Sequence, residues 1–98
     1  MRFEIEFTTD AIDDMHSFRK HERKYIFEEV EIQLEYQPIE ETRNRKKLRP
    51  NQLAEWELRM DRFRVFYDVD TEKQRVIIEA IGYKRGNQLF IRGEEYTL

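Results

Sequence analysis

The sequence predicts an α+β fold in which two helices pack on one face of a mainly antiparallel sheet. Apolar residues alternate with polar ones near the N-terminus, recur at helical spacing over residues 11–34, and alternate again from residue 56 onward. A strand, a helical hairpin and then a run of strands is the element order of a two-layer domain. With 98 residues the chain has room for one domain, which we place at 1–98.

The N-terminal part predicts the strand and both helices. Residues 3–7 alternate apolar and charged side chains, and residues 8–10 then offer oxygens that can cap a helix. A short helical stripe runs to Phe18, and the chain breaks around Lys20-His21. A second, longer helix carries its apolar stripe over residues 26–34 and ends before Pro38.

The C-terminal part predicts three or four strands. In residues 54–70 every second residue is apolar, with a tight connection at Asp61-Arg62. The predicted core-facing residues are Trp56, Leu58, Phe63, Val65 and Tyr67. A turn at residues 70–73 precedes a nearly continuous apolar strand over 76–81, and Gly86-Asn87 marks the turn before a short strand at 89–91.

Composition excludes several classes of protein. There is no cysteine, and the two histidines form no metal-binding motif, so we expect neither a metal nor another cofactor. No leader-like segment opens the sequence and no run of eighteen apolar residues occurs, so we expect a cytoplasmic protein without a membrane partner.

Charge is segregated along the chain. Residues 1–42 contain 12 acidic and 5 basic side chains, whereas residues 43–98 contain 9 acidic and 13 basic ones, for a net charge of -3 overall. The densest basic segment is 43–49, with five cations in seven residues. A local positive field can bind phosphate on a protein of negative net charge, although such a run can also be only a solvated loop.

Four segments follow the leading strand and the helical hairpin in a fixed order. They are Lys46-Lys47-Leu48, Trp56-Glu57-Leu58-Arg59, Arg64-Val65-Phe66-Tyr67 and Ile81-Gly82-Tyr83-Lys84-Arg85. This ordered set resembles the RelE/ParE superfamily of toxins from bacterial type II toxin–antitoxin systems. The resemblance covers nearly the whole chain and implies a RelE-like fold and a cognate antitoxin as partner. A homodimer is a further possibility.

The resemblance implies one of two activities. Members similar to RelE are mRNA interferases, endoribonucleases that cleave messenger RNA on the ribosome and inhibit translation. Members similar to ParE inhibit DNA gyrase without being enzymes. A catalytically inactive relative that only binds antitoxin is a third reading, because fold alone does not select a function.

The resemblance also suggests site residues. The candidate catalytic residues are Arg64, Arg59, Lys84 and Glu57, and the candidate RNA-binding residues are Arg45, Lys46, Lys47, Arg49, Arg62, Arg85 and Tyr83. Arg59 and Arg64 fall on the non-core faces of adjacent predicted strands, where one phosphate could touch both. The alternative is that they form surface ion pairs with Glu57 and Glu79.

The sequence departs from the RelE pattern at the groups that move protons. It has Glu57 where RelE-like enzymes have lysine, Lys84 where they have arginine, and Phe90 where they have tyrosine. Glu57 could be a general base or only a counter-ion of the arginines, and Tyr83 could be a proton donor. The sequence leaves these alternatives open.

Overall fold

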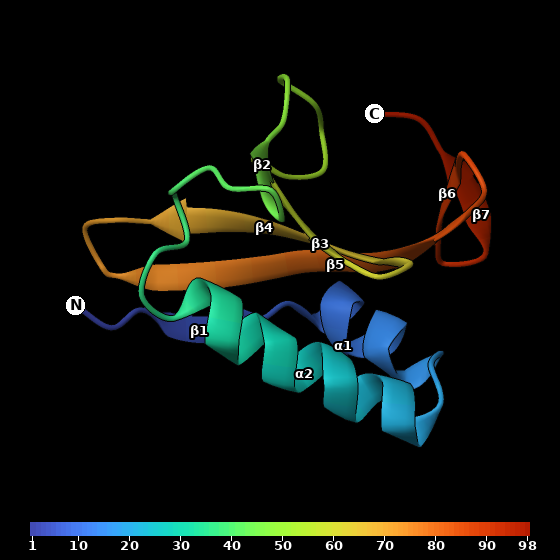
Figure 1. Ribbon diagram of the computed structural model, residues 1–98, viewed down its shortest axis with the longest axis horizontal. Helices are drawn as coiled ribbons and strands as arrows, with labels where there is room; N and C mark the ends of the chain where they lie inside the picture. The colour runs from blue at the N-terminus through green and yellow to red at the C-terminus, as the bar shows by residue number, and fades with distance from the viewer.

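The computed structural model describes residues 1–98 and confirms the predicted α+β arrangement (Figure 1). Its elements are β1 (Glu4–Phe7), α1 (Thr9–His16), α2 (Lys20–Leu34), β2 (Arg45–Lys47), β3 (Trp56–Met60), β4 (Phe63–Asp70), β5 (Arg75–Arg85), β6 (Gln88–Ile91) and β7 (Glu94–Tyr96). The sheet has seven strands, more than predicted, because β2 forms within the basic segment and β7 follows the last predicted strand.

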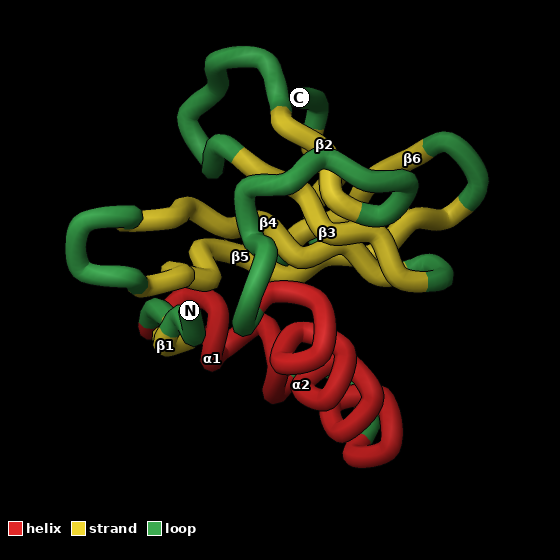
Figure 2. Tube along the Cα trace, turned by 60° about the vertical axis from the view of Figure 1, so that its left-hand side comes forward, coloured by secondary structure: helices red, strands yellow, loops and turns green.

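The long strand β5 organises the sheet. Strands β2 to β7 lie in chain order and each pairs antiparallel with the next. β1 pairs parallel with the first part of β5, where Ile5 lies opposite Val76. β6 pairs antiparallel with the last part of β5, along the same edge of that strand. Both helices lie on one side of this sheet (Figure 2).

Side-chain caps fix where the helices begin. The Thr8 hydroxyl accepts a hydrogen bond from the Ala11 N–H at 3.1 Å at the start of α1. The Arg19 N–H donates to the Glu22 carboxylate at 2.9 Å at the start of α2. The break therefore ends at Arg19. The prediction of a break around Lys20-His21 is wrong, because both residues belong to the first turn of α2.

The main core lies between the helices and the sheet. Ile26, Val30 and Leu34 of α2 pack in one cluster with the core-facing residues of β3 and β4, as predicted. The buried Tyr67 hydroxyl donates to the Pro38 carbonyl at 2.7 Å, and burial raises the pKa of Tyr67 above its ordinary value of 10.0. This bond ties the segment after α2 to the middle of the sheet.

A second, smaller core covers part of the opposite face. Phe66, which the alternation assigned to the non-core face, is fully buried there with Ala80, Leu89 and Ile91. The β6–β7 hairpin packs so closely on β5 that a β-carbon at Gly82 would clash with the Phe90 carbonyl. The face away from the helices is therefore partly enclosed.

None of the helices is both long enough and apolar enough to cross a membrane.

Candidate functional site

The sheet brings polar side chains into rows on its face away from the helices. Arg59 on β3 lies directly opposite Arg64 on β4. In the neighbouring rows, Lys46 lies opposite Glu57, and Lys84 lies opposite Leu89, which in turn lies opposite Tyr96. These rows bring together the four residues predicted to be catalytic.

The two arginines form a close cross-strand pair. The Arg59 N–H donates to Asn44 on the β2 side at 2.8 Å, so Arg59 and Arg64 exchange no backbone hydrogen bond with each other. In an antiparallel ladder, such pairs have the shorter Cα separation. Like charges directly opposite each other destabilise a sheet, and the pair therefore favours a neighbouring anion.

Glu57 supplies a negative charge to this pair. Its side chain is only 5% exposed, and its Oε1 accepts a hydrogen bond from Arg59 Nε at 2.7 Å. Glu57 is therefore a counter-ion of Arg59 in this structure.

Arg64 is held by backbone carbonyls and not by a carboxylate. Its Nη1 donates to the carbonyls of Asp61 and Phe63 at 2.7 and 2.8 Å, and it forms no ion pair with Glu79. Its Nε is buried without a hydrogen-bond partner. Burial lowers the pKa of Arg64 below its ordinary value, whereas the nearby Glu57 carboxylate opposes that change.

A cleft of about 360 Å³ opens beside the arginine pair. Glu57, Arg59, Lys84 and Tyr96 are among its lining residues. The predictions did not include Tyr96, because β7 has only three residues and no alternating pattern reveals it. Tyr96 and Glu95 of β7 line the cleft together with Lys84 of β5, although Phe90 occupies the position suggested by the resemblance.

The structure places Arg45 and Arg62 away from the cleft. Arg45 is buried on the helix side and donates to the carbonyl oxygens of Gln33 and Glu40 at 2.7 and 3.0 Å. Arg62 pairs with Glu22 of α2 and lies over the Phe63 ring. Because both guanidiniums are engaged with the helical layer, neither lies with the cleft residues.

Tyr83 and Arg85 also point to a different face. Tyr83 stacks against Phe90 and packs edge-on against Phe18 of the α1–α2 connection, with centroids 5.5 and 6.3 Å apart. Arg85 lies over the Phe90 ring, 5.7 Å from its centroid. Tyr83 therefore lies on the helix side, across the sheet from Lys84, and is not placed to donate a proton in the cleft.

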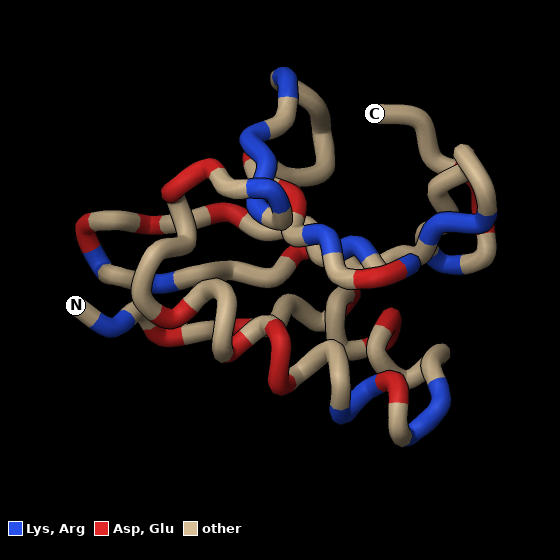
Figure 3. Tube along the Cα trace, viewed as in Figure 1, with Lys and Arg blue, Asp and Glu red and all other residues tan.

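Of the remaining basic residues only Lys46 is placed on the cleft face of the sheet. Lys47 lies on the helix side with Trp56, because it is opposite Trp56 and its Nζ is 5.8 Å from the centroid of that ring. Lys46 lies beside Glu57, and the exposed Lys47 makes an ion pair with Glu55 at 3.9 Å. Arg49 is exposed in the loop that follows β2. Figure 3 shows basic residues gathered along β2 and this loop. No group of three or more His, Asp or Glu side chains is arranged to hold a metal ion.

Comparison with solved structures identifies the fold as RelE-like. A chain of the toxin–antitoxin complex RelBE2 from Mycobacterium tuberculosis superposes with a TM-score of 0.75 at 24% identity, over 86% of this chain and 93% of that one. A chain of the archaeal RelE–RelB complex from Pyrococcus horikoshii superposes with a TM-score of 0.69 at 21% identity, over 89% and 99%. At these identities the likeness shows the fold alone.

No protein-family model and no curated protein sequence matches the chain.

Proposed function

We propose that the protein is the toxin of a toxin–antitoxin pair and that it cleaves messenger RNA on the ribosome. The observation that carries the proposal is the opposed pair Arg59 and Arg64, in which Arg59 pairs with the buried Glu57 carboxylate whereas Arg64 has no carboxylate partner. An RNA phosphate supplies a further negative charge beside both guanidiniums, although the buried Arg64 Nε is not among the atoms that it reaches. The RelE-like fold supports the same assignment.

The proposed reaction needs stabilisation of charge on phosphate. The 2′-hydroxyl attacks the adjacent phosphorus to form a 2′,3′-cyclic phosphate, and the 5′-oxygen leaves. Negative charge grows on the non-bridging oxygens, so Arg59 and Arg64 stabilise the transition state more than the ground state. Lys84, on the same side of the sheet, adds a third positive charge.

Two cleft residues complete the proposed proton transfer. Glu57 accepts the proton of the 2′-hydroxyl, and the Tyr96 phenol donates a proton to the departing 5′-oxygen. One proton is gained by the Glu57 carboxylate and one is lost by the Tyr96 phenol, and both residues line the cleft. The Glu57 side chain is only 5% exposed and its Oε1 is held by Arg59, so this step requires that the RNA phosphate take over Arg59 and release the carboxylate toward the 2′-hydroxyl.

The proposed partner is an antitoxin that covers the cleft. The structures with which the chain superposes come from RelB–RelE complexes. Because Arg59 and Lys84 line the cleft and Lys46 lies in the neighbouring row, an acidic and extended antitoxin segment suits the cleft electrostatically.

Induction of the chain in bacteria tests the proposal. We expect growth arrest and codon-phased RNA cuts in 5′-end mapping, and we expect Arg64→Ala to abolish both because it removes half of the phosphate clamp. Tyr96→Phe should slow cleavage by about 100-fold or more while growth arrest develops late. Arg75→Ala is the matched control, because Arg75 lies at the far end of β5 and pairs with Glu6.

The same experiment separates the alternative targets. Growth arrest without RNA cuts but with accumulated gyrase–DNA adducts would contradict RNA cleavage and indicate gyrase inhibition. The absence of toxicity in a folded, abundant protein would indicate an inactive antitoxin-binding relative. RNA cuts that persist in Arg64→Ala would contradict the role of the arginine pair.

A further inference from the structure

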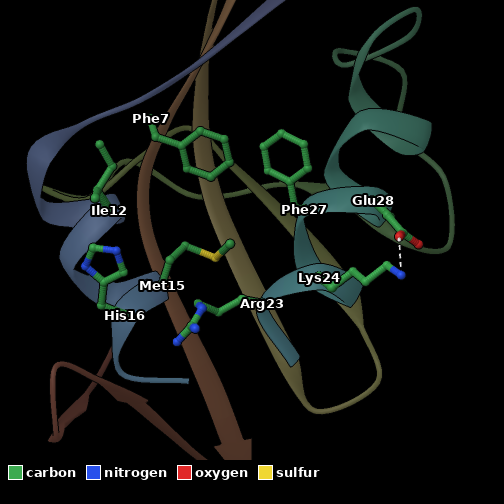
Figure 4. Close-up of a pocket in the computed structure, with 8 residues that line it drawn as sticks. All are labelled: Phe7, Ile12, Met15, His16, Arg23, Lys24, Phe27 and Glu28. Atoms are coloured by element: carbon green, nitrogen blue, oxygen red, sulfur yellow. Dashed lines mark ion pairs between the residues drawn. The ribbon is translucent and has the colours of Figure 1, made fainter. Parts of the chain in front are cut away.

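An apolar groove lies on the outer surface of the helical layer, on the side of the molecule away from the cleft. It has a volume of about 640 Å³, and its apolar lining consists of Phe7 at the end of β1, Ile12 and Met15 of α1 and Phe27 of α2. Figure 4 shows the Phe7 and Phe27 rings side by side, and their centroids lie 5.9 Å apart. Phe27 is 46% exposed and Ile12 is 45% exposed, and together with Phe7 and Met15 they form one contiguous apolar surface.

The charges of α2 change sign along the helix. Its first part carries Lys20, Arg23 and Lys24 with one acidic residue, whereas the residues after Phe27 carry only acidic charges. Figure 3 shows this polarity, with blue at the start of the helix and red toward its end. A helix dipole favours acidic residues at the N-terminus and basic ones at the C-terminus, so this order does not stabilise the helix itself.

The groove lies at the point where the charge changes sign. Lys24 lines the groove with Phe27, and Glu31 lines an adjoining hollow of about 550 Å³ that shares Phe27. Lys24, Phe27 and Glu31 are spaced i, i+3 and i+7, so they lie on one face of α2. Lys24 is therefore about 4.5 Å along the axis before Phe27, and Glu31 about 6 Å after it.

This face is complementary to itself. If two copies of α2 cross antiparallel with a two-fold axis near Phe27, Lys24 of each copy lies opposite Glu31 of the other. The same axis brings the two apolar grooves together and covers both Phe27 rings. A closed two-fold interface of this kind needs one self-complementary patch, which the sequence of α2 supplies.

We propose that a second copy of this chain occupies the groove, forming a two-fold dimer through α1, α2 and Phe7. The intramolecular pair of Lys24 with Glu28 is long, at 4.0 Å, and both side chains are more than half exposed, so Lys24 is available to a partner. The dimer leaves the phosphate cleft open, because that cleft lies on the other face of the sheet. The dimer is therefore compatible with messenger RNA as the target and also with DNA gyrase.

Sedimentation velocity and light scattering on the purified chain test the dimer. We expect the mass to rise with concentration from 12.2 kDa to twice that value. Phe27→Lys should weaken dimerisation by at least about tenfold, because a buried aromatic anchor is lost. Ile32→Lys is the matched control, since Ile32 is a 72% exposed apolar residue on the same helix outside the groove, and it should leave the dimer unchanged.

A charge exchange tests the two-fold arrangement directly. Lys24→Glu and Glu31→Lys should each weaken the homodimer by at least about fivefold, because each places like charges in contact twice. An equimolar mixture of the two variants should dimerise as well as the unmodified chain, since every contact is again between opposite charges. Circular dichroism confirms that each variant is folded.

Three results would overturn the proposal. They are a mass of one chain at all concentrations up to about 1 mM, equal effects of Phe27→Lys and Ile32→Lys, and failure of the mixed charge variants to associate. None of these results bears on the proposed RNA cleavage, because that activity is tested separately by Arg64→Ala on the opposite face of the sheet. Conversely, an inactive cleft would not affect the mass of the chain.

Discussion

At the scale of single residues, Arg45 and Arg59 show that equal charge leads to different roles. Both lie on short strands and pair across the same ladder, because Arg45 is opposite Leu58 and Arg59 is the next residue along. A shift of one residue turns a side chain to the other face of a sheet. Arg45 is therefore buried against the helical layer, whereas Arg59 lies beside the cleft with its side chain 49% exposed.

Arg45→Ala should lower the stability of the fold, which a substitution that only weakens RNA binding would not do. Removing the guanidinium leaves the Gln33 and Glu40 carbonyls without their donor, and we expect a loss of about 2–4 kcal/mol in the free energy of unfolding. Urea denaturation measures it. Arg43→Ala is the control in the same basic segment, and because Arg43 is exposed its effect should stay within about 0.5 kcal/mol of zero. Equal effects would contradict this role for Arg45.

At the scale of elements, Asp14 connects three parts of the chain. The α1 side chain is 1% exposed, and its Oδ2 accepts a hydrogen bond from the Ile81 N–H of β5 at 3.0 Å. Its Oδ1 pairs with Arg92 in the β6–β7 turn at 3.2 Å. Burial is the largest influence on the carboxyl and raises the pKa of Asp14 despite these partners. Asp14 thus holds α1 to the hairpin that carries Tyr96.

Replacement of Asp14 should separate its two contacts. Asp14→Ala leaves the Ile81 N–H buried without an acceptor, whereas Asp14→Asn keeps a side-chain oxygen but loses the charge that pairs with Arg92. We expect the alanine variant to be less stable than the asparagine variant by about 1–3 kcal/mol. Urea denaturation gives the difference, and hydrogen exchange of the Ile81 amide should be faster only in the alanine variant. Equal stabilities would show that this hydrogen bond contributes little.

At the scale of the whole molecule, the protonation of Glu79 makes stability depend on pH. Glu79 is the extra residue of β5 where the ladder with β4 shifts register. Burial, and after it the hydrogen bond and charge of Asp68, raise the pKa of Glu79 from 4.5 to about 7. Between these values the folded chain binds more protons than the unfolded chain, so this group makes stability fall as pH rises.

Thermal unfolding from pH 4.5 to pH 7 tests this dependence. In Glu79→Gln the fall in Tm with rising pH should be smaller than in the unmodified chain, because the side chain can no longer lose a proton. Glu94→Gln, at an exposed position of β7, is the control and should leave the dependence unchanged. Identical curves for all three proteins would contradict the role of Glu79.

Much of the fold and part of the site could be predicted from periodicity. Alternation in β3 and β4 placed Trp56 and Tyr67 in the core and Arg59 with Arg64 on the other face, and the structure agrees. The family resemblance, and not periodicity, suggests Tyr83 as a site residue together with Lys84. Adjacent residues of a strand point to opposite faces, and the structure separates the two accordingly. In β2, the sequence Arg45-Lys46-Lys47 has no apolar residue that could reveal which side chain is buried.

The sequence by itself determined the α+β class, the helix–sheet core and the separation of acidic from basic residues, because these depend on local spacing and composition. Only the tertiary structure decided which cations share a site with Glu57. It also decided that Phe66 is buried and that Tyr96 reaches the cleft, because both depend on how the β6–β7 hairpin folds back over the sheet. Contacts of that kind join residues far apart in the chain, and no local pattern records them.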